Sequence, residues 1–205
     1  MKYPVRKIIR DTRVWLDFNR EERPLVKVCD EGNLTINDII RSKVVTATRT
    51  VVLQLDNLLL APGQPVRTSL AWPGGAPGKG MAVMPLPDDC LRLLTVKLTD
   101  WTRPAHIITE NDPEYRWQQS PFPGVRGNPD RPVAAICQRP TGWVAELYSS
   151  TAGTRVAIEA AQYYPVPCID SDDTIHIPSL AYDDVVKTVA LLTAETLGHA
   201  YEKNH

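Results

Sequence analysis

The feature of the sequence that most restricts the fold is a long, regular series of apolar residues between positions 36 and 60. Its members recur at steps of three and four: Ile36, Ile40, Val44, Ala47, Val51, Leu55 and Leu58. This spacing averages close to the α-helical period and predicts a nearly straight amphipathic helix over residues 36–60, about 37 Å long. Thr35 and Asp38 resemble a capping box at its start, and Pro62-Gly63 are expected to end it.

Two further segments show helical spacing, one near each end of the chain. Residues 4–18 carry a stripe that includes Val5, Ile8, Ile9, Thr12, Trp15 and Leu16. Residues 179–202 carry a second stripe, formed by Tyr182, Val185, Val189, Leu192, Thr196 and Ala200. Each stripe predicts an amphipathic helix. Because the apolar face of the last helix must be buried against another element, we expect this helix to pack against the helix over residues 36–60.

The middle of the chain, about residues 81–164, has a different pattern. Short runs rich in Val, Ile, Leu and aromatic residues predict strands over residues 91–98, 105–109, 132–138, 142–149 and 155–163. Gly142, after Pro140-Thr141, indicates a hairpin, and residues 150–153 are expected to join the last two strands. The sequence therefore predicts one α+β domain over residues 1–205. A helical layer of two N-terminal helices and one C-terminal helix would carry an inserted antiparallel β-meander, interrupted over residues 110–131.

Composition and charge narrow the function. The chain is 43% hydrophobic and 23% charged, which is typical of a folded protein. Its net charge of −1 gives no overall attraction to nucleic acid or to an anionic membrane. No apolar run approaches the roughly 20 residues of a membrane-spanning helix, and no secretory signal is recognisable, so we expect a product of the cytoplasm with no membrane partner. The cysteines form no C-x-x-C pair and lie far from the histidines, which predicts reduced thiols and no zinc site: Cys29, Cys90, Cys137 and Cys168.

The motifs of common enzyme classes are missing. There is no G-x-S-x-G, H-E-x-x-H or G-x-G-x-x-G, and the glycine-rich stretch 74–80 lacks the G-K-[ST] ending of a phosphate loop. The D-S-D-D run at residues 170–173 lacks the glycine and glutamate of a calcium loop and indicates a solvated turn. We therefore expect no catalytic, cofactor-binding or metal-binding residues. Two alternatives stay open: a small enzyme with a dispersed active site, and a DNA-binding module that uses the basic face Arg6, Arg10 and Arg13 of the first helix.

Two irregular segments, residues 61–80 and 110–131, are rich in proline, glycine and aromatic residues. Aromatic side chains in such segments either pack onto the domain or contact a partner. The candidates for an assembly interface in and near these segments are Trp72, Trp101, Tyr115, Trp117, Phe122 and Arg126.

The order of motifs resembles a known family. N-L-T-I-N-D-I-I and R-S-K-V-V-T-A-T-R-T-V precede L-P-D-D-C-L-R-L-L-T-V-K-L-T-D-W-T-R-P at residues 86–104, and D-P-E-Y-R-W-Q-Q, R-P-V-A-A-I and W-V-A-E-L-Y-S follow. This arrangement, which covers most of the chain, resembles the head-to-tail adaptor or neck-ring proteins of tailed phages. It is most similar to the tail-tubular adaptors of short-tailed phages and to the ring proteins of crAss-like phages.

The resemblance implies a structural protein of the virion neck or tail and not an enzyme. Such a protein forms a ring, expected to be a dodecamer, that binds the portal protein and other tail or neck proteins. The ring extends the channel through which DNA leaves the capsid without being read. Trp72, Tyr115, Trp117 and Phe122 would contact neighbouring proteins. Some adaptors extend well beyond the last helix, whereas this chain ends at His205, so we do not expect portal docking by a long C-terminal tail.

Overall fold

A computed structural model describes residues 1–16, 35–60, 62–73, 81–120, 122, 125–148 and 156–197. Helices and strands occupy separate segments, which confirms the predicted α+β class. The chain divides into two compact units, Met1–Leu60 with Pro167–His205 and Ala61–Val166, called here the helical unit and the β unit. The apolar patterns predicted one domain with an insertion over residues 81–164, whereas the structure has two units. The β unit starts earlier because Gln64 and Ala71 already pair with its strands.

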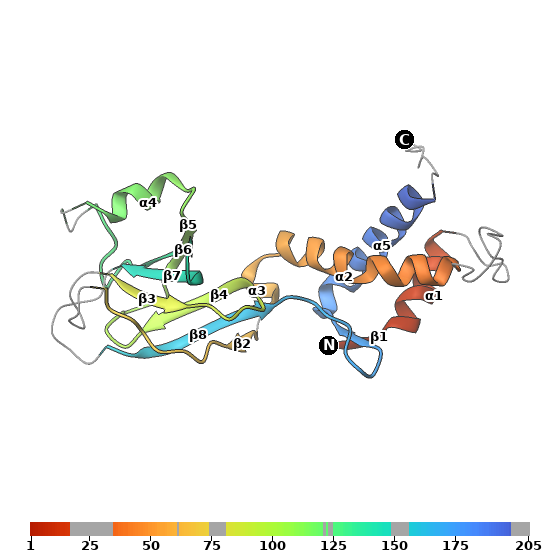
Figure 1. Cartoon of the computed structure of the whole chain (residues 1–205), viewed down its shortest axis with the longest axis horizontal. Helices are drawn as coiled ribbons and strands as arrows, with labels where there is room; N and C mark the ends of the chain where they lie inside the picture. Colours follow the sequence, from red (N-terminus) through yellow and green to blue (C-terminus); the bar gives the residue numbers. More distant parts are fainter. Residues whose placement is uncertain are drawn as a thin grey trace. The chain divides into compact units, whose positions relative to one another are not determined.

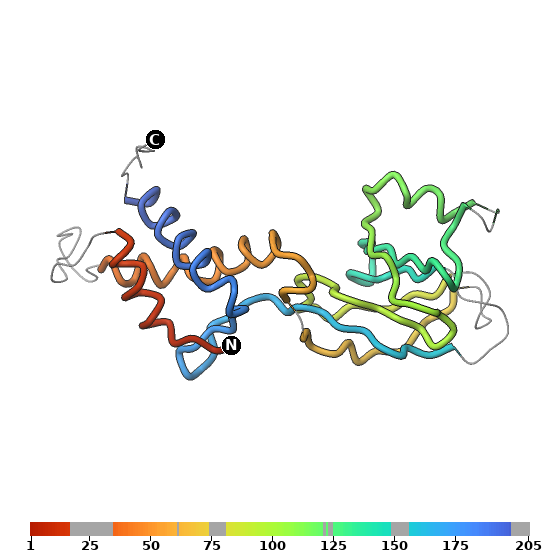
Figure 2. The backbone as a smooth tube through the Cα atoms, turned by 180° about the vertical axis from the view of Figure 1, so that it is seen from behind, coloured from red at the N-terminus to blue at the C-terminus, as the bar shows by residue number. Residues whose placement is uncertain are grey.

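The helical unit contains three main helices and a two-stranded ribbon (Figures 1 and 2). Its elements in chain order are β1 (Lys2–Pro4), α1 (Val5–Trp15), α2 (Ile36–Gln54), α3 (Asn57–Leu60), β9 (Thr174–His176), the 3₁₀ helix η1 (Ser179–Ala181) and α5 (Tyr182–Thr196). Strands β1 and β9 pair in antiparallel register, Tyr3 opposite Ile175. The ribbon thus ties the start of α1 to the segment that leads into α5.

The helix boundaries follow the local signals with one exception. Thr35 and Asp38 form the predicted capping box, since the Thr35 side chain accepts from the Asp38 N–H and the Asp38 side chain accepts from the Thr35 N–H. The prediction of one helix over residues 36–60 is wrong at its C-terminal end. Leu55 adopts extended dihedral angles, φ −76° and ψ 152°, so α2 stops at Gln54. The short α3 then leaves Leu58 85% exposed rather than on the buried stripe.

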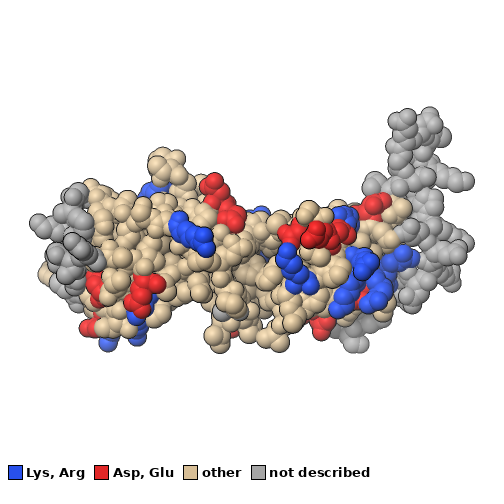
Figure 3. All heavy atoms as spheres, turned by 90° about the horizontal axis from the view of Figure 1, so that it is seen from below, with Lys and Arg blue, Asp and Glu red and all other residues tan. Residues whose placement is uncertain are grey.

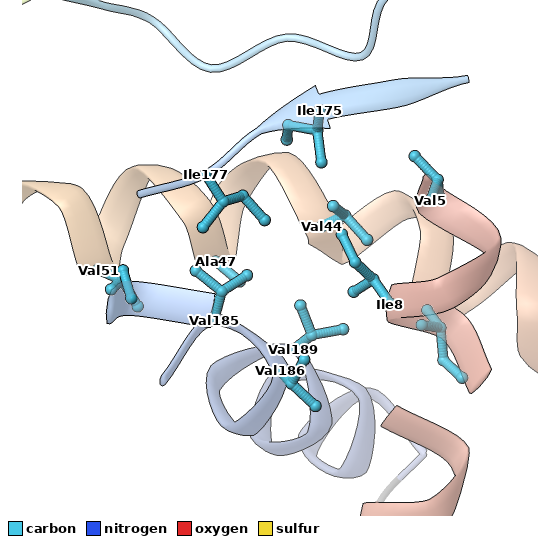
Figure 4. Close-up of a cluster of buried hydrophobic side chains, with 12 residues drawn as sticks. Val5, Ile8, Val44, Ala47, Val51, Ile175, Ile177, Val185, Val186 and Val189 are labelled. Atoms are coloured by element: carbon cyan, nitrogen blue, oxygen red, sulfur yellow. The ribbon is translucent and has the colours of Figure 1, made fainter. Parts of the chain in front are cut away.

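The core of the helical unit lies between α2, α5 and α1 (Figure 4). Val44 and Ala47 of α2 face Val185 and Val189 of α5, while Ile8 of α1 closes the side. All five side chains are fully buried. Burying one Val or Ile side chain is worth about 1.5–3 kcal/mol. The predicted packing of the last helix against the long helix is therefore confirmed.

The β unit consists of two sheets and one short helix. Its elements are β2 (Gln64–Pro65), β3 (Ala82–Pro85), β4 (Cys90–Leu98), β5 (His106–Thr109), α4 (Pro113–Gln118), β6 (Val133–Arg139), β7 (Gly142–Tyr148) and β8 (Ile158–Pro165). One sheet has the order β2-β8-β4 and the other β3-β7-β6-β5. Their facing sides share a core that includes Met84, Leu93, Val96, Leu98 and Leu147.

The pairing of these strands differs from the predicted meander. The hairpin of β6 and β7 is confirmed, with Arg139 opposite Gly142 and Gly142 at φ +115°, a backbone conformation that suits glycine. However, β5 runs parallel to β6, because the chain passes through α4 between them and returns to the same end of the sheet. Strands β7 and β8 belong to different sheets and so are not the adjacent pair that was expected. Residues 149–155, which join them, lie outside the described residues.

Candidate assembly interface

The segment predicted as an irregular excursion, residues 110–131, has a defined fold in its described part. Helix α4 begins after Asp112 with Pro113 in its first turn, a position that proline favours because no N–H is needed there. The Asp112 carboxylate accepts hydrogen bonds from the Thr109 N–H at 2.7 Å and from the Thr109 hydroxyl at 2.9 Å. These bonds lower the pKa of Asp112. They fix the direction in which the chain leaves β5.

A buried glutamine closes the loop that follows α4. Gln118 is 5% exposed, and its Oε1 accepts from the Gly127 N–H at 2.8 Å while its Nε2 donates to the Glu114 carbonyl at 3.2 Å. Between these points, the N–H groups of Val125 and Arg126 both donate to the carbonyl of Phe122. These bonds connect Gln118 with Gly127 and Phe122 with Val125 and Arg126.

A network of polar side chains joins α4 to the sheet beneath it. Glu146 on β7 is only 3% exposed, and it accepts hydrogen bonds from Arg139 Nε at 2.9 Å, the Tyr115 hydroxyl at 3.0 Å and the Tyr148 hydroxyl at 2.8 Å. Arg139 Nη2 also donates to Glu146 and, at 2.9 Å, to the Tyr115 hydroxyl. Tyr115 comes from α4, and the other three residues come from the β6–β7 hairpin. We call these four residues the Glu146 network.

The network is charged at neutral pH. Burial by itself would raise the pKa of Glu146, but the hydrogen bonds from Arg139, Tyr148 and Tyr115 outweigh it and hold the pKa below its ordinary value. Burial and the bond to Glu146 raise the pKa of Tyr148. Burial likewise raises the pKa of the neighbouring Cys137 thiol to about 11, so this cysteine stays protonated. The network is thus suited to hold α4 in place and not to transfer protons near pH 7.

Helix α4 and the segment that follows it expose apolar side chains to solvent. Trp117 is 54% exposed, Phe122 68% and Val125 51%, and the flanking Arg116 and Arg126 are exposed as well. These five residues are called here the Trp117 surface. The structure thus places three predicted interface candidates at the surface, Trp117 on α4 and Phe122 and Arg126 in the segment that follows it.

The other three candidates lie elsewhere. Trp101 is 3% exposed and belongs to the core between the two sheets, so its assignment to an interface is corrected. The Trp101 N–H donates to the Leu98 carbonyl, and the turn that this bond closes directs the indole into the core. The indole Nε1 has no hydrogen-bond partner in the described structure. Trp72 is half-buried against the same core. Tyr115 is half-buried in the Glu146 network, where it supports the interface from below.

Sequence analysis did not find the Glu146 network. A glutamate in a strand is usually read as solvent-facing, since charged side chains are rarely buried unless paired. The alternation in Gly142–Tyr148 contained the missing signal, because it puts Glu146 on the same face as Val144 and Tyr148. Only the placement of α4 over that face shows that it is buried.

The basic face of the first helix is partly neutralised. Arg10 Nε lies 3.2 Å from Asp11 Oδ1, and Arg13 Nη1 donates to Asn37 Oδ1 at 3.3 Å. On the face that Figure 3 shows, acidic side chains lie beside the basic ones. The acidic turn is similarly paired, with Asp170 2.6 Å from Lys2 Nζ and Asp173 2.6 Å from Arg41 Nη2.

The described residues contain no group of three His, Cys, Asp or Glu side chains that could hold a metal ion. Within the same part of the chain, no helix is long and apolar enough to cross a membrane. Cys90, Cys137 and Cys168 are free thiols, while Cys29 lies outside the described residues. Comparison with protein-family models gives no matching family, and comparison with curated proteins gives no match.

Proposed function

We propose that this chain is a structural protein of a phage virion, a portal-to-tail adaptor whose copies form a ring around the DNA channel. The observation that carries the proposal is the Trp117 surface. Trp117 on α4, and Phe122 and Val125 after it, are each more than half exposed, and the Glu146 network attaches α4 to the sheet through Tyr115. Clustered exposed aromatic side chains mark contact sites for other proteins.

The attachment of α4 also supports the proposal. Because Tyr115 is bonded to Glu146 and Arg139 of the sheet, the helix that carries Trp117 is held before binding and loses little conformational entropy, so more of its contact energy appears as affinity. This suits a subunit that must make the same contact many times in one assembly. The motifs that resemble phage adaptors include D-P-E-Y-R-W-Q-Q, the segment that forms α4 and carries Trp117.

The proposed partners are other copies of the chain, expected as a dodecamer, the portal protein, and further tail or neck proteins. DNA would pass through the lumen during genome ejection without sequence-specific contacts, which suits a net charge of −1 and basic side chains that are paired or dispersed. The site of action would be the neck or tail of the virion, after synthesis in the host cytoplasm.

Size-exclusion chromatography with mass measurement, followed by negative-stain electron microscopy, tests this function. The chain is examined alone and mixed with the portal protein encoded in the same genome. Rings, or an assembly that forms on the portal, are the expected result. A compact monomer that never associates with the portal, or that turns over a small molecule, would contradict the proposal.

A further inference from the structure

A second exposed apolar area lies on the β unit, and it carries the opposite charge. Trp143, the second residue of β7, is 52% exposed. Its carbonyl accepts from the Leu86 N–H at 3.0 Å, which brings the turn after β3 beside it. That turn contains Asp88 and Asp89, both exposed. We call Leu86, Asp88, Asp89 and Trp143 the Trp143 surface.

The part of the Trp117 surface that follows α4 leads to the end of the sheet opposite Trp143. Trp143 pairs with Gln138, so it is located where β6 ends and β7 begins. Because β5 and β6 are parallel, the chain after β5 must travel back along the sheet through α4 before β6 can start. The loop that carries Phe122, Val125 and Arg126 is the last part of this return, just before Val133 opens β6 (Figure 1).

The two surfaces also belong to opposite faces of that sheet. Glu146 faces α4, since it accepts a hydrogen bond from Tyr115. Side chains alternate along a strand, so Trp143 shares the other face with Ala145 and Leu147, which line the core between the sheets. One copy therefore carries α4 and the Trp117 surface on the outer face of this sheet, while Trp143 is exposed where the hairpin begins, on the face that lines the core.

The charges of the two surfaces are complementary. Arg116 precedes Trp117 in the chain and Arg126 follows Val125, while Asp88 and Asp89 lie in the turn whose Leu86 N–H bonds the Trp143 carbonyl. None of these four charged side chains forms an ion pair with a described residue. Asp89 does accept hydrogen bonds from the Tyr163 hydroxyl, at 3.1 and 3.2 Å, which holds its carboxylate in place. Each surface thus combines exposed aromatic area with two charges of one sign that are unpaired within the described chain.

We propose that the Trp117 surface of one copy docks on the Trp143 surface of the next copy. Because the two surfaces differ, the contact is heterologous: each copy uses one surface as donor and the other as acceptor, and repetition builds a ring. Trp117 and Trp143 are both exposed, so the two surfaces are accessible in the same copy. This inference deepens the proposed adaptor function and rests on it, since it names the contact between ring subunits.

Two charge-reversed variants test the contact: R116D/R126D, which makes both surfaces acidic, and D88R/D89R, which makes both surfaces basic. Each variant alone should self-associate about 10- to 100-fold more weakly than the wild-type chain, because like charges then face each other. A 1:1 mixture should restore assembly, since acidic surfaces of one variant meet basic surfaces of the other. Sedimentation velocity over a concentration series measures both effects, and added salt should weaken the wild-type contact.

R67D is the matched control, because Arg67 is exposed on the β unit outside both surfaces, and it should assemble like the wild type. Circular dichroism confirms folding. D88R alone serves as a second variant, because Asp89 also bonds Tyr163.

The inference is overturned if the wild type stays monomeric, if either double variant assembles normally alone, or if the mixture remains dissociated. If the variants still form the rings or portal complexes that the wild type forms, the proposed contact is wrong and the adaptor function is retained. If the wild type self-associates through these surfaces but forms no ring and does not bind the portal, the contact is retained and the adaptor function is wrong.

Discussion

Replacing Arg139 with alanine should destabilise the β unit through the carboxylate that it leaves behind. Glu146 is 3% exposed, so its charge cannot be solvated once the guanidinium is removed. Breaking a buried ion pair from one side costs about 3–5 kcal/mol. The hydroxyl groups of Tyr115 and Tyr148 would still donate to Glu146, and the Arg139 side chain is itself 40% exposed, so we expect the lower end, about 3 kcal/mol.

The reciprocal change should cost less. In Glu146→Gln the orphaned group is Arg139, which can reach solvent and also lies 4.0 Å from Glu110. We expect a loss of about 1–2 kcal/mol. The double variant R139A/E146Q should lose about 1–2 kcal/mol less than the sum of the two single losses. The reason is that E146Q removes the buried charge that R139A alone leaves unpaired.

The loss in Arg139→Ala should also depend on pH. In the wild-type chain the pKa of Glu146 is lowered, so its stabilising contribution is present at neutral pH and is lost only as pH falls below the ordinary glutamate range of about 4. Without Arg139, burial is opposed only by the tyrosines and the pKa should rise. As the pH is lowered, protonation removes the unpaired charge of Glu146 in the variant. The difference in unfolding free energy between the two proteins should therefore shrink from pH 7 to pH 4.5.

Urea unfolding followed by tryptophan fluorescence measures these values. Four of the five tryptophans, all except Trp15, lie in the β unit, so the signal reports mainly on that unit. Lys97→Ala is the matched control, because it breaks the exposed pair of Lys97 with Glu159 and should cost less than about 1 kcal/mol. Equal losses in R139A and E146Q, or a difference from wild type that does not change with pH, would refute the reasoning.

Four further changes test the packing and the exposed surface. Ala47→Asp should unfold the helical unit, because it buries an unpaired charge at a fully buried position between α2 and α5, and circular dichroism would show the loss of helix. Trp101→Ala should cost about 3–5 kcal/mol in urea unfolding, whereas Trp117→Ala should change stability by less than about 1 kcal/mol and weaken assembly measured by sedimentation. Gly63→Ala should lower the melting temperature, because a Cβ there would lie 2.6 Å from Leu94 Cδ1 and 2.7 Å from a backbone carbonyl oxygen.

Each of these results has a matched comparison. Arg49→Asp places the same side chain on the exposed face of α2 and should leave the helical unit folded. A stable Ala47→Asp variant would mean that the buried face of α2 is assigned incorrectly. A large stability loss in Trp117→Ala would place Trp117 in the core, and an unchanged melting temperature in Gly63→Ala would mean that the neighbouring strand can move aside.

Local patterns in the sequence were enough to locate the three long helices and one hairpin, but not α3, α4 or the end of α2. Apolar spacing of three and four located α1, α2 and α5, and Thr35 with Asp38 marked a helix start, because these signals act between residues a few positions apart. Pro140-Thr141 before Gly142 located the β6–β7 hairpin for the same reason. The packing of α2 against α5 also followed, since the apolar stripe of the last helix had to be covered and the long helix offered the longest apolar face.

Tertiary structure alone decided which strands pair and which aromatic side chains face outward. Alternation of side chains does not name a strand's partner, so the parallel pairing of β5 with β6 and the separation of β7 from β8 into two sheets could not be inferred. Trp101 and Trp117 occur in similar surroundings of proline, arginine and polar residues, yet one is 3% and the other 54% exposed. Burial depends on what the rest of the chain places over a residue, and for Glu146 that covering element is α4, which lies about 30 positions earlier in the chain.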